Sequence, residues 1–505
     1  MSQEGDDNDI VKVYFSDVFE VDPDVIEGYG AFNISLINDL PLFIDPFLLF
    51  NSNEPEYRAL HDEILKYVAF LRDMSLTGGI NPGLLKNWFL FPEVKQNWLG
   101  FSEIGNEGSG LGPDFALALN RNLNQIFSNF GEETITKSSH LEKLCLIKSG
   151  VGKDNISDFT TNLIKKFLLE YTQTFAQAHI AKSRRGIFPV ERVYFNFETR
   201  SWVTARFDLP SYYGDFVLLT PKDILTKEDT WINKSDIVNR FNDIVIGIPN
   251  EQLRAQINQY FVMNLPRREK KRGKGYKEPT KKEIAEAVGS VIAKYPEFID
   301  YYVRFKEDNG DEAKSVSETR VQEVESLFIR ELSGLIHTLI VKSDFYKVGS
   351  DTIDECYQRV LFLKNVIENK DGYRIFYVKG EPIKRESDLH VMFRLTWFAT
   401  LSDVSPETND GRGPVDFKIS RGSQDKTLVE FKLASNSKLK QNLAKQVEVY
   451  KKAHDTDKAI KVILFFTYNE EQRVRAILKE LDLENEKYMV LIDARNDNKP
   501  SASNA

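Results

Sequence analysis

The sequence predicts a protein of the mixed α/β (α+β) class with more than one domain. Two patterns favour this class. Near the C-terminus, apolar residues alternate with polar ones as in half-buried strands, and amphipathic helical runs lie between them. Elsewhere, apolar residues recur at helical spacing over long stretches. The length of 505 residues and the 41% hydrophobic content fit two or three globular domains.

Residues 1–265 are expected to form a mixed α+β domain. Its role is expected to be sensing or interaction, because we find no firm catalytic motif in it. Strand-like composition occurs in residues 10–15, 190–197, 202–207 and 215–220. Helical periodicity occurs in residues 56–71, 115–130 and 156–179.

Residues 266–370 are predicted to be a basic linker followed by a helical connector. Nine Lys and Arg residues lie between positions 267 and 282, and interspersed glycines argue against a helix there. Such a segment either attracts phosphates without reading sequence or is simply a solvated linker. Helices are expected to dominate from 281 to 369, including a long amphipathic helix at 315–343 that would connect domains or mediate dimerisation.

Residues 371–505 are predicted to form the third unit, and a β-hairpin is its clearest feature. Apolar and charged residues alternate in residues 415–419 and again in 427–433, and a polar stretch between them predicts the turn. The charged face would carry Asp416 on the first strand. It would carry Glu430 and Lys432 on the second. We therefore expect the two carboxylates to lie close together.

Two neighbouring carboxylates repel each other unless a cation lies between them. Mg²⁺ fits this position because it prefers oxygen ligands and keeps several waters, and Mn²⁺ is an alternative. A bound Mg²⁺ can take a phosphate oxygen and lower the pKa of an attacking water. The carbonyl of Phe431 is a further expected ligand. Lys432 lies two residues from Glu430 and can orient the water or offset charge on the phosphate.

A helix is expected at residues 436–454, directly after the hairpin. Leu439, Leu443, Gln446 and Tyr450 share one face of it. A polar Gln446 on an apolar stripe needs a partner, and the metal–phosphate site is a candidate. Strands are expected to follow at 459–467 and 488–493.

Three motifs of this region resemble the motif series of the PD-(D/E)XK nuclease superfamily. The resemblance covers roughly residues 381–495 and implies a restriction-endonuclease-like core, in which helices flank a mixed central sheet. The glutamine–tyrosine pair is similar to that of the RecB-like and Cas4-like branch. The motifs are Gly413-x-x-Asp416, Glu430-x-Lys432 and Gln446-x-x-x-Tyr450.

The resemblance also implies roles for these residues. Asp416 and Glu430 would bind the metal, Lys432 would serve catalysis, and Gln446 would support the site. In this superfamily a carboxylate from an upstream helix often joins the metal site. The choice lies between Glu386, which starts a helical run, and Glu407, which is expected to lie in a loop. Glu386 is preferred.

The function implied by the resemblance is Mg²⁺-dependent hydrolysis of DNA phosphodiester bonds by an endonuclease; the motifs do not distinguish DNA from RNA. A nuclease attached to a large unassigned domain is similar to effectors of bacterial antiphage defence or restriction, in which the nuclease acts only after a partner or trigger engages the rest. A second copy of the chain or a partner defence protein is therefore an expected partner. The alternative is a non-catalytic nucleic-acid-binding or assembly protein with a degenerate nuclease domain. Arg412, Lys418 and Lys438 are expected to touch the nucleic-acid backbone.

Charge and composition argue against several other classes of protein, namely dedicated DNA-binding, zinc-binding and membrane proteins. The net charge of −9 is unlike that of a dedicated DNA-binding protein, so local patches must make any nucleic-acid contact. Cys145 and Cys356 are far apart and lack the spacing of a zinc site. No apolar run reaches the roughly twenty residues that span a membrane, and the N-terminus is acidic. We therefore expect a cytoplasmic protein without membrane contact.

Overall fold

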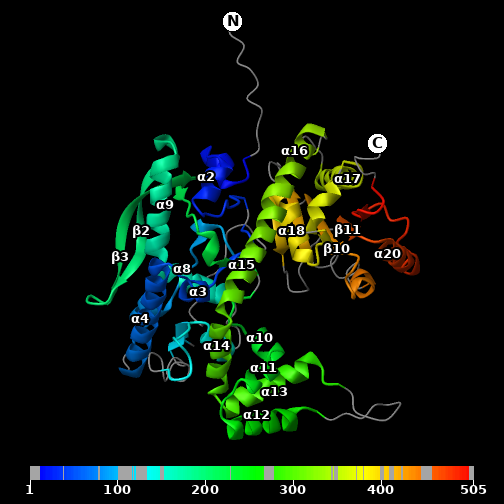
Figure 1. Cartoon of the computed structure of the whole chain (residues 1–505). Coiled ribbons are helices and arrows are strands. Elements are labelled where there is room, and N and C mark those ends of the chain that lie inside the picture. The colour runs from blue at the N-terminus through cyan, green and yellow to red at the C-terminus, as the bar shows by residue number, and fades with distance from the viewer. Residues whose placement is uncertain are drawn as a thin grey trace.

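The fold is α+β, as the sequence predicts. In Figure 1 the N-terminal part and the C-terminal sheet lie on either side of a long helical run, and a group of helices lies below them. The computed structural model describes residues 12–37, 39–77, 80–100, 116–117, 119–120, 133–147, 153–227, 229–266, 278–342, 345, 351–370, 372–378, 380–397, 403–408, 415–421, 425–444 and 458–499.

A long hairpin is the main sheet of the N-terminal part. It consists of β2 (Arg185–Asn196) and β3 (Ser201–Tyr212), and β4 (Asp215–Phe216) adds a short third strand. Figure 1 shows the hairpin at the outer edge of the molecule, with α9 (Lys165–His179) beside it. The apolar side chains between the hairpin and α9 form a buried cluster that includes Leu169, Val190, Phe207 and Leu209.

The rest of the N-terminal part is built from shorter elements around a shared core. A two-stranded sheet pairs residues that are far apart in the sequence, β1 with β5. These elements are α1 (Phe15–Phe19), α2 (Pro23–Gly28), β1 (Phe43–Ile44), α3 (Pro46–Phe50), α4 (Pro55–Thr77), α5 (Pro82–Phe89), η1 (Lys95–Asn97), α7 (Lys143–Ile147), α8 (Lys153–Leu163), η2 (Lys182–Arg184), η3 (Lys222–Ile224) and β5 (Leu225–Thr226).

The strand predictions at the two ends of this part were wrong in detail. Residues 10 and 11 lie outside the described part of the chain; in residues 12–15, Tyr14 makes an isolated bridge with Ser35, and α1 begins directly after it. The side chain of Asp17 accepts the N–H of Tyr14 and so holds the helix start. The strand predicted at 215–220 ends at Phe216. The N–H of Val217 still donates to a carbonyl of β3, but the N–H groups of residues 218 and 219 donate to η1 and α9.

The helix predictions hold with one correction. The run at 56–71 lies within α4, whereas the single helix expected at 156–179 is divided into α8 and α9. Ile164 separates them with a ψ of 12°, which turns the chain while its N–H still donates to Thr160. Most of the run at 115–130 lies outside the described residues.

The long helix expected at 315–343 is present as one continuous run. It consists of α15 (Gly310–Glu325), a π-helical turn η4 (Ser326–Glu331) and α16 (Leu332–Lys342). Figure 1 shows this run rising between the two halves. A π turn interrupts the regular backbone hydrogen bonds, and here the hydroxyl of Tyr14 donates to the carbonyl of Phe328. The connector is thereby attached to the start of the N-terminal part.

Five further helices form the group at the bottom of Figure 1 and lead into this run. The basic segment at 267–277 lies between two of them, outside the described residues. In the described part of the chain, no helix has the length and apolar character needed to cross a membrane. The five helices are α10 (Lys234–Asn239), α11 (Phe241–Ile246), α12 (Glu251–Asn264), α13 (Lys281–Lys294) and α14 (Phe298–Asp308).

The C-terminal core is a mixed five-stranded sheet in the order β12-β11-β10-β9-β8. Its first three strands in the chain pair antiparallel, and β11 and β12 pair parallel to β10 and β11. All four strands predicted in this region are present. The strands are β8 (Asp403–Thr408), β9 (Val415–Arg421), β10 (Asp425–Leu433), β11 (Ala459–Phe465) and β12 (Met489–Asp493).

Helices cover both faces of this sheet. On one face, α17 (Thr352–Asn369) and α18 (Glu386–Thr396) pack against the apolar side chains of β9 and β10. On the other face, α20 (Tyr468–Glu480) and the segment after β10 pack against β11 through Leu439, Leu443 and Ile463. Before α18 lie η6 (Gly372–Phe376), β6 (Tyr377–Val378) and β7 (Glu381–Pro382).

We predict that Phe393→Ala destabilises the C-terminal core by about 3–5 kcal/mol, because it removes a buried ring and leaves a cavity. The ring centroid of Phe393 lies 4.1 Å from that of Phe431 and 5.0 Å from that of Phe417. The midpoint of urea unfolding measures this loss. Tyr468→Ala is the control, since Tyr468 is 60% exposed; equal midpoints for the two variants would contradict this packing.

Candidate active site

Polar side chains gather where β9 separates from β10. The ladder between these antiparallel strands runs as far as the pair Phe417 and Val429. The next N–H groups on this edge of β10 donate to carboxylates instead. The N–H of Phe431 donates to Asp416 Oδ2 at 2.6 Å, and the N–H of Leu433 donates to Glu386 Oε1 at 3.3 Å. The end of the ladder therefore fixes two acidic side chains.

Lys432 lies at the centre of the site. Its Nζ is 3.4 Å from Glu386 Oε2, 3.5 Å from Asp416 Oδ2 and 3.3 Å from Glu430 Oε1. The three carboxylates come from α18, β9 and β10, so three elements meet at one ammonium group. The side chains of Asp416, Glu430 and Lys432 are about nine-tenths buried, which strengthens their electrostatic interactions.

The choice of Glu386 over Glu407 agrees with this geometry, but the loop expected at Glu407 was wrong. Glu386 is the first residue of α18, and Asn436 Nδ2 donates to its Oε1 at 2.8 Å. Glu407 lies in strand β8, because this segment pairs with β9. Its neighbours Pro406 and Thr408 are opposite Phe417 and Val415, and the side chain of Glu407 lies outside the description.

Sequence reasoning missed two charged residues of the site, His390 and Lys461. His390 Nε2 lies 3.2 Å from Asp416 Oδ2, one helical turn after Glu386. Lys461 on β11 is in register with Glu430, and its Nζ lies 3.7 Å from Glu430 Oε2. The i, i+4 spacing of Glu386 and His390 and the alternation along β11 were signals that could have found them.

The pKa values of the two central carboxyl groups, Asp416 and Glu430, shift in opposite directions. Burial raises the pKa of Asp416, but His390, Lys432 and the N–H of Phe431 outweigh this effect, and its pKa lies below the ordinary value. For Glu430 burial dominates over the nearby charges of Lys432 and Lys461, and its pKa is raised. Asp416 is therefore well compensated as an anion, whereas the charge of Glu430 is not.

The pKa values of the cationic groups also depend on the balance between burial and nearby charges. Burial lowers the pKa of Lys432, but the three surrounding carboxylates outweigh it, and the pKa is raised. The pKa of His390 is likewise raised by Asp416 against the effect of burial. Lys461 has a lowered pKa, because burial exceeds the contribution of Glu430. Lys432 is thus held as a permanent cation.

The oxygen atoms available at this site are of the kind that Mg²⁺ prefers as ligands. Asp416 and Glu430 supply carboxylate oxygens, and the carbonyl of Phe431 points to the same edge of β10 as its N–H. Burial raises the pKa of Glu430 despite the nearby ammonium groups of Lys432 and Lys461. Within the described segments, no three His, Cys, Asp or Glu side chains are arranged as ligands of one metal ion. The ammonium of Lys432 lies among the carboxylates in this arrangement.

The other predicted site residues either lie outside the described residues or lie on β9 and in the turn after β10. Gln446, Tyr450 and Arg412 lie outside the described residues. The helix expected at 436–454 is described from 439 to 444. Lys418 is half-buried on β9, opposite Leu428. Lys438 is exposed in the turn after β10, and its N–H donates to the side chain of Asn436.

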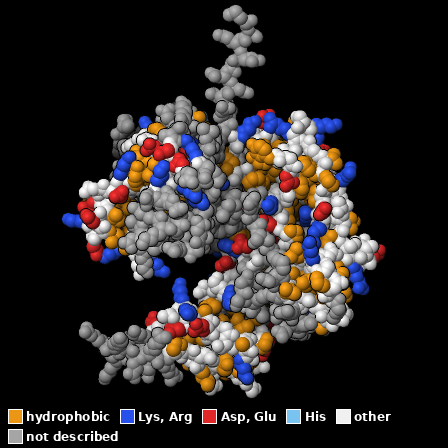
Figure 2. All heavy atoms as spheres, turned by 180° about the vertical axis from the view of Figure 1, so that it is seen from behind, with side chains coloured by type: hydrophobic (Ala, Val, Ile, Leu, Met, Phe, Trp, Pro, Cys, Tyr) orange, Lys and Arg blue, Asp and Glu red, His pale blue; other side chains and the backbone are white. Residues whose placement is uncertain are grey.

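The face seen from behind in Figure 2 carries basic and acidic side chains side by side. In the space-filling view from behind, Lys and Arg side chains occur together with Asp and Glu side chains and are not gathered into one broad patch (Figure 2). Two basic residues beside the hairpin are already engaged in ion pairs. Arg421 contacts Glu355 at 2.7 Å, and Lys440 contacts Glu480. Nucleic-acid contact by these two residues would require breaking such pairs.

In the comparisons with known proteins, two segments of the chain match models of domains of unknown function. Residues 20–233 match a domain of unknown function (DUF8370), and residues 352–468 match another (DUF8371). The second match includes α17, α18 and the strands β8 to β11, and therefore the whole charged cluster. No curated protein and no solved structure matches the chain.

We predict that two charge-removing variants shift stability in opposite directions. Asp416→Asn should lower the melting temperature at pH 7, because a carboxyl with a lowered pKa contributes stability above its unfolded pKa of about 3.9, and this contribution is lost as the pH falls. Glu430→Gln should raise it, because ionising a carboxyl with a raised pKa opposes folding above about pH 4.3.

Thermal unfolding of both variants at pH 7 and at low pH measures these effects. Both differences from the wild type should shrink as the carboxyls become protonated. Two shifts of the same sign at pH 7 would show that the charges of this cluster are not balanced in the way described.

Proposed function

We propose that the C-terminal part of this protein is a Mg²⁺-dependent nuclease that hydrolyses DNA phosphodiester bonds. The observation that carries the proposal is the position of Lys432, within 3.5 Å of carboxylates from three elements. This cluster stands at the end of a hairpin ladder, where backbone N–H groups orient two of the acids. It combines with the motif resemblance, which assigns the same residues to catalysis.

Asp416, Glu430 and the carbonyl of Phe431 would hold the metal, and Glu386 would complete the acidic set. When bound, Mg²⁺ neutralises charge on the scissile phosphate and lowers the pKa of a water molecule. The N–H of Phe431 fixes one oxygen of Asp416, and Asn436 fixes one oxygen of Glu386. Such bonds hold carboxylates in place without a rearrangement during the reaction.

Lys432 would activate or orient the attacking water. The three surrounding carboxylates raise its pKa and so favour the ammonium form. A fixed ammonium can also stabilise the negative charge that develops on the phosphate in the transition state. His390 lies against Asp416 and would keep that carboxylate ionised and oriented.

For the whole chain we propose a role as an effector of bacterial antiphage defence or restriction. The support is the architecture alone: a nuclease-like unit follows a large part with a different match and a long helical connector. In this role the N-terminal part would sense a trigger or contact a partner. A second copy of the chain or a partner protein would complete the active assembly.

One observation favours the alternative of a non-catalytic protein. Lys432 lies among three acids, so the cluster already compensates part of its own charge. Buried ion pairs of this kind also occur where they only specify structure. Titration calorimetry with Mg²⁺ and Mn²⁺ separates the two functions, because a degenerate site should bind neither ion.

We predict that the purified protein cleaves DNA in the presence of Mg²⁺ and that Asp416→Ala and Lys432→Ala each reduce the rate by at least about 100-fold. The reason is the loss of a metal ligand in the first variant and of the fixed cation in the second. Labelled single- and double-stranded DNA and RNA, tested side by side, measure the activity and its substrate.

Lys479→Ala is the matched control, since Lys479 is exposed on α20 and should leave the rate unchanged. Melting curves verify that the inactive variants remain folded. Cleavage by Asp416→Ala and Lys432→Ala at the wild-type rate would refute the assignment.

A further inference from the structure

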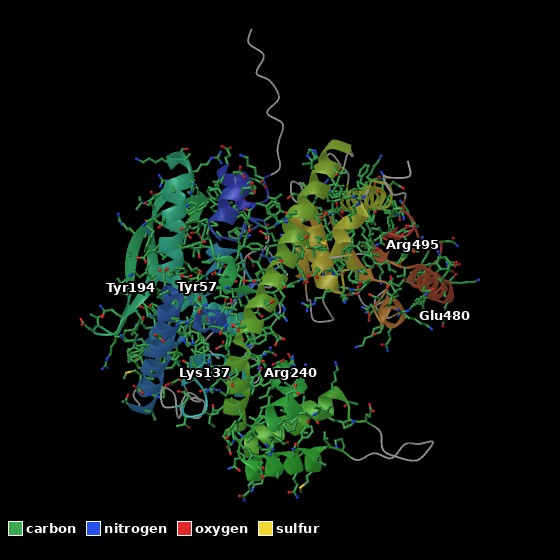
Figure 3. The ribbon with its side chains drawn as sticks, viewed as in Figure 1. Tyr57, Lys137, Tyr194, Arg240, Glu480 and Arg495 are labelled. Atoms are coloured by element: carbon green, nitrogen blue, oxygen red, sulfur yellow. The ribbon has the colours of Figure 1, made fainter. Side chains whose placement is uncertain are left out.

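A cavity of about 530 Å³ lies between the N-terminal part and the start of α15. Its walls come from α3, α4, η3, the segment at 137–138 and the junction of α14 and α15. This volume lies within the range of about 300–1,000 Å³ that is usual for small-molecule sites. Figure 3 labels Tyr57 and Lys137, which lie on the side of the N-terminal part that faces α14 and α15. None of the proposed nuclease residues lines the cavity.

Contacts between the two parts hold the walls in place. Asn51 Nδ2 donates to the carbonyl of Gly310 at 2.7 Å, and a Cβ on Gly310 would lie only 2.2 Å from Asn51 Oδ1. The buried carboxylate of Glu307 accepts the N–H groups of Lys137 and Ser138 and lies 3.0 Å from His140 Nε2. These contacts join residues far apart in the sequence, so the cavity is formed before any ligand binds.

His61 indicates that a ligand belongs in this cavity. It lines the cavity, is only 3% exposed, and its buried Nε2 has no hydrogen-bond partner in the part of the chain that the structure describes. Buried polar atoms are almost always hydrogen-bonded. Burial lowers the pKa of His61 to about 3, so the ring is neutral and can donate or accept one hydrogen bond. Its neighbour Phe50 lies 5.4 Å away, ring to ring.

The cations of the wall suit a phosphate group. Arg58 Nε donates to the carbonyl of Ser52 at 2.6 Å and its Nη2 to Asn53 Oδ1 at 3.4 Å, and both acceptors are neutral. Lys314 on the first turns of α15 forms a long ion pair, 4.0 Å, with Glu318. Lys137 lies on the same wall, where its Nζ pairs with Asp308 Oδ1 at 2.8 Å. Among the described residues no carboxylate pairs with Arg58, so its guanidinium and the ammonium of Lys314 can bind a phosphate, and Lys137 can join them if it leaves Asp308.

The acidic and aromatic groups of the wall suit a nucleoside. The carboxylates of Asp62, Asp223 and Asp311 line the cavity and can accept hydrogen bonds from sugar hydroxyls. One oxygen of Asp223 already accepts the hydroxyl of Tyr57 at 2.8 Å. Phe50 offers an aromatic ring for a base. A phosphate alone would leave these groups without a role.

We propose that this cavity binds a nucleoside phosphate. The phosphate lies among Arg58, Lys137 and Lys314, the sugar hydroxyls face the carboxylates, and the base lies against Phe50 and bonds to His61. The proposal does not rest on the nuclease assignment, because the two sites share no residue.

Titration calorimetry on the full chain with EDTA tests the proposal without the metal-dependent chemistry. The probes are ATP, AMP, adenosine and inorganic phosphate. ATP or AMP should bind with a Kd below about 1 mM, and adenosine and phosphate at least about tenfold more weakly. Lys314→Ala should weaken nucleotide binding about tenfold or more. Lys166→Ala is the matched control, because Lys166 also pairs with a Glu four residues later on an exposed helix face.

His61→Phe tests the buried nitrogen. This variant keeps the aromatic packing and removes the hydrogen-bonding atom, so nucleotide affinity should fall while phosphate affinity stays the same. The melting temperature of the free protein should not fall, which shows that the loss is not one of folding.

Three results would overturn the proposal. The first is that neither ATP nor AMP binds at concentrations up to about 1 mM. The second is an equal effect of Lys314→Ala and Lys166→Ala. The third is binding of a polyamine such as spermidine in preference to the nucleotides, which would show that the acidic groups determine the ligand.

Discussion

The C-terminal site depends on the place where the β9–β10 ladder ends. Up to Val429 the edge of β10 is occupied by β9, and beyond it the N–H of Phe431 donates to Asp416. The carboxylate thus completes a hydrogen bond that a strand would otherwise make, and it does so in a buried position. Two cationic groups of the cluster, Lys432 and His390, contact Asp416 directly.

This constraint explains why the acids of the cluster behave differently. Asp416 has a backbone donor and two cationic neighbours, and its pKa is lowered. Glu430 has two ammonium neighbours at 3.3 and 3.7 Å, and burial still raises its pKa. A metal ion bound by both acids would compensate Glu430 most. Burial therefore outweighs the neighbouring charges at Glu430 but not at Asp416.

The long run from α15 to α16 connects the two regions of interest. Its first turns supply Asp311 and Lys314 to the cavity, and its last part contacts α17 and α18, which cover the C-terminal sheet. Near its middle, a π-helical turn exposes the carbonyl of Phe328 to Tyr14. The proposed ligand site and the proposed catalytic site are thus linked by one continuous helical element.

The sequence by itself determined four of the five strands of the C-terminal sheet, the grouping of Asp416, Glu430 and Lys432, and the long connector helix. Alternation and helical spacing are local, and adjacent strands follow from a short turn. Only the tertiary structure decided that His390 and Lys461 join the cluster, that Glu407 lies in a strand and that a cavity forms around His61. These features depend on contacts between residues far apart in the chain, and local patterns carry no information about which distant segments pack together.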